Sequence, residues 1–83
     1  MFEQQLTRYQ ALLQTVGPAS AEGRAYDYLI YIIETNTVND VPGVIHQALE
    51  TNIWLRDTAI SASDREQWQT RVTIFQEFLA GLT

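Results

Sequence analysis

The stretch RAYDYLIYII, residues Arg24 to Ile33, decides the fold of this chain. Eight of its ten side chains are apolar or aromatic, and only Arg24 and Asp27 interrupt them. Aromatic and β-branched residues favour strands. However, no other segment shows the alternation with a period of two that a pairing strand would need. An isolated strand would leave its backbone groups unpaired, so the stretch is predicted to be a helix.

On a helical wheel this segment is apolar over about 200°, whereas a helix that faces a core usually needs about 100°. The expected core stripe consists of Tyr26, Leu29, Ile30 and Ile33. Tyr28 and Ile32 widen that stripe, and Tyr31 lies apart on the polar side. Either the segment is a central helix covered by neighbours on two sides, or Tyr28, Tyr31 and Ile32 form part of a surface that contacts another protein.

Two helices are predicted in the first half of the chain, over about residues 2–16 and 20–35. The first has apolar side chains spaced three and four residues apart, which places them on one face. Gly17 and Pro18 should end it, because glycine suits the residue after a helix and proline cannot continue one. Ser20 is the expected N-cap of the second helix.

Two more helices are predicted over about residues 41–58 and 64–80. Asp40 can cap the third helix, and Pro42 is tolerated in its first turn. Gly43 should weaken that helix by about 1 kcal/mol relative to alanine. The sequence SDRE places Ser63 at the N-cap of the fourth helix and Glu66 three residues later, which is the capping-box pattern.

Four helices with short connections, and no convincing strand, predict an all-α fold. We expect a compact up-and-down bundle of four short helices. Eighty-three residues are the length of one domain, so residues 1–83 are predicted to form a single helical domain.

The charge composition excludes several classes of partner. Lysine is absent, and five arginines face ten carboxylates, for a net charge of −5. Direct nucleic-acid binding and binding to anionic membranes both depend on positive charge, so neither is expected. No signal peptide is recognisable, and the longest apolar stretch is shorter than the roughly 20 residues that span a bilayer. The sequence therefore predicts a soluble, cytoplasmic protein.

No constellation of residues predicts catalysis, a metal or a cofactor. His46 has Glu50 one helical turn later and Asp57 further along the same side, which could make a general base or two metal ligands. Without cysteine or a second histidine such a metal site would be weak, so a solvated His–Glu pair is the favoured interpretation. Asn52, on the apolar side of the third helix, is interpreted as a satisfied core group or an interface contact that sets register, in preference to a catalytic amide.

Trp54 lies on the polar side of the third helix, where it either covers a loop or anchors a partner. Together with the wide second helix, it favours apolar surface left exposed for an interaction. We therefore expect a non-catalytic, small, acidic protein that acts by protein–protein binding, as an adaptor, regulator or inhibitor, and that forms a homodimer. The predicted protein-binding residues are Tyr28, Tyr31, Ile32 and Trp54. The alternatives are a structural or accessory subunit of a larger assembly and, more remotely, a nucleic-acid mimic.

Overall fold

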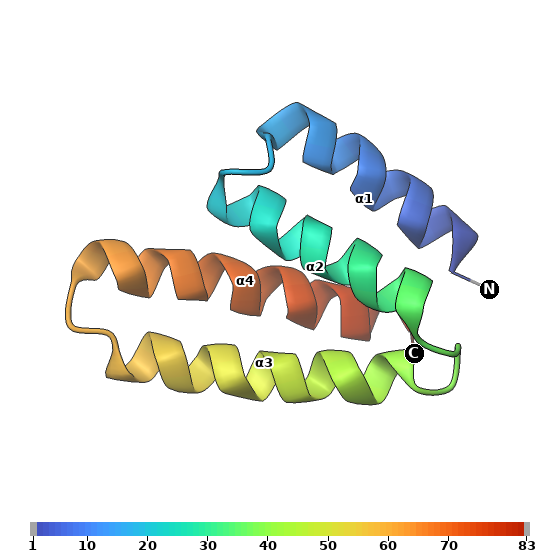
Figure 1. The fold of residues 1–83 in the computed structure, drawn as a ribbon. Coiled ribbons are helices and arrows are strands. Elements are labelled where there is room, and N and C mark those ends of the chain that lie inside the picture. The colour runs from blue at the N-terminus through green and yellow to red at the C-terminus, as the bar shows by residue number, and fades with distance from the viewer. Residues whose placement is uncertain (1, 83) are drawn as a thin grey trace.

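The computed structural model describes residues 2–82, and this part of the chain contains four α-helices and no strand. They are α1 (Glu3–Val16), α2 (Ala21–Thr35), α3 (Val41–Thr58) and α4 (Ala62–Ala80). Successive helices run in opposite directions (Figure 1). The predicted all-α fold of four helices is confirmed, and each predicted helix begins within two residues of the observed one.

The four helices do not pack as the corners of a regular square bundle. The backbone of α2 approaches all three other helices, whereas within the described residues the backbone of α1 approaches α2 alone. α3 packs along α4 as a hairpin, and this hairpin extends beyond the α1–α2 hairpin at one end (Figure 1). The molecule is accordingly elongated, with extents of 39 × 27 × 21 Å.

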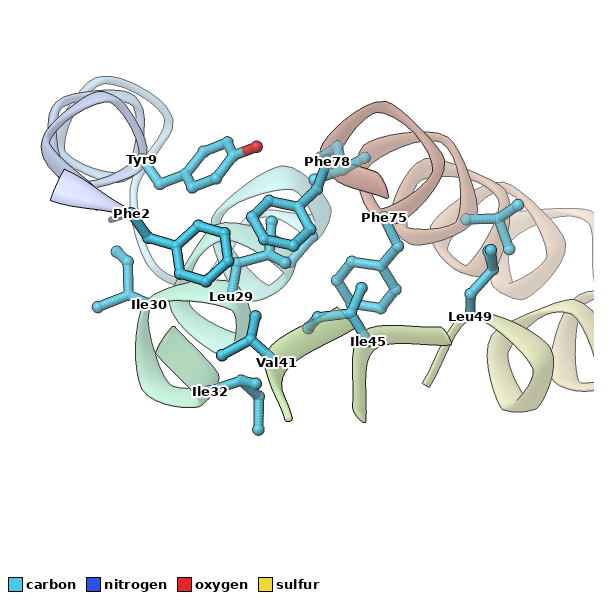
Figure 2. Packing of buried hydrophobic residues seen from close by; sticks show 13 residues of the cluster. Phe2, Tyr9, Leu29, Ile30, Ile32, Val41, Ile45, Leu49, Phe75 and Phe78 are labelled. Atoms are coloured by element: carbon cyan, nitrogen blue, oxygen red, sulfur yellow. The ribbon is translucent and has the colours of Figure 1, made fainter. Parts of the chain in front are cut away.

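The central position of α2 accounts for most of its wide apolar arc. Its buried apolar side chains are Ala25, Leu29, Ile30 and Ile32. They join one core cluster with side chains from the other three helices, including Tyr9, Ile45 and Phe75 (Figure 2). A helix with neighbours on several sides can bury more than one apolar stripe. The structure therefore agrees with the first alternative, in which this segment is a central helix covered by its neighbours.

Aromatic side chains connect the outer helix α1 to α4. Figure 2 shows Phe2, which precedes α1, and Tyr9 pointing toward Phe78 of α4. The ring centroids of Phe2 and Phe78 are 5.8 Å apart, and those of Tyr9 and Phe78 are 6.0 Å apart. Tyr9 also stacks on Tyr26 of α2, with 5.7 Å between centroids. Such contacts contribute about 0.5–1.5 kcal/mol each beyond the area that they bury.

The connection between α1 and α2 follows the sequence signals. Gly17 ends α1 with a φ of 84°, a conformation that favours glycine. Ser20 caps α2 as predicted, because its Oγ accepts a hydrogen bond from the Gly23 N–H at 2.9 Å. The Ser20 hydroxyl also donates to the Gly17 carbonyl oxygen at 2.9 Å, which ties the connection together.

The predicted caps of the other two helices need correction. Ser61, and not Ser63, caps α4, since the Ser61 Oγ accepts a hydrogen bond from the Asp64 N–H at 3.1 Å. The helix starts at Ala62, so Ser63 lies inside its first turn. Asp40 does occupy the N-cap position of α3, but its side chain makes no capping hydrogen bond. Its backbone is helical (φ −87°, ψ −26°) and lacks the extended geometry that usually aims a capping side chain at the helix.

None of the helices in residues 2–82 is both long enough and apolar enough to cross a bilayer.

Candidate functional site

The four residues predicted to bind a protein differ widely in exposure. Tyr31 is 61% exposed and Trp54 is 62% exposed, so both present most of an aromatic ring to solvent. Tyr28 is 36% exposed, with one side against Phe75. Ile32 is only 5% exposed and belongs to the core, so it has no surface to offer a partner.

Tyr31 and Trp54 lie at different levels of the bundle. α2 and α3 are antiparallel neighbours in sequence, joined by the short connection 36–40 (Figure 1). With a rise of about 1.5 Å per residue, Tyr31 lies about 6 Å before the end of α2, and Trp54 lies about 20 Å after the start of α3. The exposed aromatic side chains are therefore two separate positions and do not make one compact cluster.

A groove lies among α2, α3 and α4, and we call it the central groove. Its volume is about 430 Å³, and α2, α3 and α4 all contribute to its walls. It is lined by Tyr28, Val44, Gln47, Ala48, Thr51, Asn52, Leu55, Trp68, Arg71 and Phe75. Trp54 is one helical turn from the lining residue Thr51, and Tyr31 is one turn from Tyr28, but neither Trp54 nor Tyr31 lines the groove.

Aromatic rings form part of the groove's wall. The rings of Tyr28 and Phe75 are 5.6 Å apart between centroids and inclined at 45°. The guanidinium carbon of Arg71 lies 4.8 Å from the centre of the Trp68 ring, a cation–π contact. Because Trp68 and Arg71 are three residues apart on α4, they are neighbours on one face of that helix.

Two buried polar atoms in the groove lining have no hydrogen-bond partner. Asn52 is 8% exposed, and its Nδ2 donates to the Ala48 carbonyl oxygen at 2.6 Å, while its Oδ1 accepts nothing. The Nε of Arg71 donates to nothing. A buried polar group without a partner costs about 1–3 kcal/mol, so both groups weaken the fold where they are. The prediction that Asn52 is a satisfied core group is wrong for its oxygen.

The groove is positive although the chain as a whole is negative. The pKa of Arg71 is lowered, first by burial and then by the nearby positive charge of Arg24. Among the ion pairs of the described residues, none includes either of these arginines. Burial of a cation beside a second cation is unfavourable unless an anion compensates them, and among the described residues no carboxylate lies within ion-pairing distance of either arginine.

The residues considered for metal or acid–base chemistry lie elsewhere. His46 Nδ1 and Glu50 Oε1 are 3.4 Å apart, and both side chains are well exposed, which agrees with a solvated pair at helical spacing. Among the described residues no three histidine, cysteine or carboxylate side chains gather in a way that could hold a metal ion.

Sequence reasoning singled out Asn52 and Tyr28 but did not connect them with Trp68 and Arg71. Trp68 recurs with Val72, Phe75 and Leu79 at spacings of four, three and four residues, a pattern typical of the apolar stripe of a helix. In the structure it is only half-buried and lines the groove. The pattern of a tryptophan followed three residues later by an arginine was the available signal, because it allows a stacked pair on one helix face.

No protein-family model matches this chain, and the comparisons with curated proteins and with solved structures also give no match.

Proposed function

We propose that this chain is a non-catalytic protein that acts by binding another protein, and that its first partner is a second copy of itself. The observation that carries the proposal is the exposure of two large aromatic side chains, Tyr31 and Trp54, on α2 and α3. Tyrosine and tryptophan are enriched at protein interfaces, where they bury a large area with little loss of conformational entropy.

A two-fold dimer would use these residues efficiently. In such a dimer the same surface patch of each copy contacts the other, so every exposed aromatic side chain appears twice in the interface. A few aromatic anchors commonly provide most of the affinity of an interface. The protein would then act sterically: by binding a partner it would cover part of the partner's surface, and it would carry out no chemistry.

Because the net charge is −5, the salt dependence of binding distinguishes this proposal from a nucleic-acid mimic. Two acidic copies repel one another, and salt screens that repulsion, so self-association should strengthen as the salt concentration rises. A mimic of nucleic acid would bind a basic partner, and its binding should weaken under the same change.

Light scattering across a dilution series tests the proposal. We expect wild type to form a dimer that dissociates on dilution, and Tyr31→Ser or Trp54→Ala to weaken it by roughly tenfold or more. Ile60→Ser is the matched control, because Ile60 is an almost fully exposed apolar residue in the connection between α3 and α4. A wild-type chain that stays monomeric at every concentration, or a dimer that neither aromatic substitution weakens, would refute self-association through Tyr31 and Trp54.

A second candidate, a structural subunit of a larger assembly, is favoured by the free end of the α3–α4 hairpin, which extends beyond α1 and α2 (Figure 1). Such a subunit should be incompletely folded when isolated, and hydrogen exchange should be fast at this end of the hairpin. An independent binding protein should instead unfold in one cooperative transition. Thermal unfolding followed by two different probes distinguishes these cases.

A further inference from the structure

We infer that two copies of this chain associate through one exposed face of α2, with their α2 helices antiparallel. This inference rests on the proposed self-association and deepens it, because it names the surface, the register and the contacts between the copies. The face, which we call the α2 strip, consists of Arg24, Asp27, Tyr28, Tyr31, Glu34 and Thr35.

The α2 strip is the side of α2 that the fold leaves open. The other three helices approach α2, and its apolar core residues pack against them. Of the seven exposed residues in α2, six belong to the strip and only Glu22 lies elsewhere. The six are spaced three or four residues apart, so they share a face about 120° wide. Two of them are large aromatic side chains, since Tyr31 is 61% exposed and Tyr28 is 36% exposed. The strip is therefore the face through which α2 can contact another protein.

The charges of the strip are arranged so that it complements a second copy of itself. Arg24 lies near one end, Glu34 lies near the other, and the two tyrosines lie between them. When a two-fold axis passes midway between Tyr28 and Tyr31, the two helices are antiparallel and Tyr28 of each copy lies opposite Tyr31 of the other. Each Arg24 then lies within about 1.5 Å, measured along the helix axis, of Glu34 in the other copy.

This symmetry explains why the antiparallel arrangement is favoured. A two-fold axis makes every contact occur twice, so two ion pairs and two tyrosine contacts form together. A parallel pair of α2 helices would instead bring each arginine beside the same arginine of the other copy, and like charges across an interface are unfavourable.

The expected affinity follows from the size and charge of the strip. Stable interfaces usually bury about 1,200–2,000 Å² in total, and one helix face from each copy lies at the small end of that range. Asp27 and Glu34 also give each strip two carboxylates against one arginine, so the two copies still repel one another. We therefore expect a weak dimer, with a dissociation constant on the order of micromolar, that tightens as salt screens the repulsion.

An exchange of charges within one chain tests the register, with light scattering across a dilution series as the readout. Arg24→Glu replaces both ion pairs with like-charged contacts and should weaken the dimer roughly tenfold or more. Arg24→Glu combined with Glu34→Arg restores both pairs with their signs exchanged. This double variant should return the dissociation constant to within about threefold of wild type.

The matched control is Arg24→Glu combined with Glu22→Arg. This variant has the same composition and net charge as the restored one, but its new arginine lies outside the strip, so it should remain as weak as Arg24→Glu alone. Asp27→Asn should act in the opposite direction and tighten the dimer severalfold, because it removes a repelling charge from each copy. All of these positions are exposed, so the variants should keep the fold, and circular dichroism verifies that they do.

The α2 interface is ruled out if wild type dimerises and Arg24→Glu does not weaken the dimer, or if the two double variants are equally weak. If Trp54→Ala does weaken that dimer, self-association occurs through α3, and the proposed function stands without the α2 interface. A wild-type chain that stays monomeric at every concentration refutes both, and the strip is then left to a different protein.

Discussion

Replacing Gly23 with alanine should destabilise this protein, whereas the same replacement at Gly43 should stabilise it. Each glycine is the third residue of its helix, α2 for Gly23 and α3 for Gly43, so the local helical context is matched. The two sites differ in what surrounds them. A Cβ at Gly23 would collide with the Gly17 carbonyl oxygen and would lie 2.9 Å from Ser20 Oγ, whereas a Cβ at Gly43 would meet nothing within 4 Å.

The collision at Gly23 involves backbone and cannot be relieved cheaply. The Gly17 carbonyl oxygen accepts the Ser20 hydroxyl, and Ser20 in turn accepts the Gly23 N–H. Opening this connection costs about 1–3 kcal/mol for overpacking and about 1 kcal/mol for the lost cap. Alanine returns up to about 1 kcal/mol through its better helix propensity. The net effect is a loss of about 2 kcal/mol, or a Tm lower by about 10 °C.

At Gly43 only the propensity gain remains, up to about 1 kcal/mol, which would raise Tm by about 4–8 °C. Thermal and urea unfolding followed by far-UV circular dichroism measures both variants, and hydrogen exchange should accelerate at residues 17–24 only for Gly23→Ala. If Gly23→Ala were as stable as wild type, or if both variants shifted in the same direction, the described packing of the α1–α2 connection would be wrong.

Three further predictions concern the core and the groove. Phe75→Ala should cost about 3–5 kcal/mol, because Phe75 is fully enclosed and packs on the Tyr28 ring; Gln76→Ala, at an exposed neighbour, should change the unfolding free energy by less than about 0.5 kcal/mol. Burial raises the pKa of Tyr9 above its ordinary value near 10. The unfolded chain therefore loses this proton first, and the free energy of unfolding measured by urea titration should fall as pH rises above 10. Tyr9→Phe should remove the part of that fall that comes from Tyr9. Asn52→Leu should leave stability unchanged or raise it by about 1 kcal/mol in the same titrations, since it removes an unpaired buried oxygen; a clear loss of stability would mean that the Asn52 oxygen has a partner.

Local signals in the sequence were enough to predict the helices. Apolar spacing of three and four residues, the Ser20 cap and the Gly17 stop each act over one or two turns, and all three agree with the structure. The cap of α4 was predicted wrongly because local signals did not distinguish two candidate residues. Ser61 and Ser63 are both good caps in isolation, and the choice between them depends on where the connection after α3 turns into the next helix.

The same local reasoning could not determine the surface. Ile32 and Tyr28 are four residues apart on α2 and equally apolar on a wheel, yet Ile32 is buried and Tyr28 borders the groove. The difference depends on how α3 and α4 pack around α2. Trp68 likewise follows the apolar spacing of α4, yet it is only half-buried.

The sequence by itself therefore determined an all-α chain of four helices and the concentration of apolar residues on α2, because periodicity and capping depend only on neighbouring residues. Only the tertiary structure decided that α2 is the central helix, that α1 packs on the outside, and that one buried arginine N–H and one buried asparagine oxygen lack hydrogen-bond partners. These features arise from the relative placement of whole helices, which depends on side chains far apart in the chain.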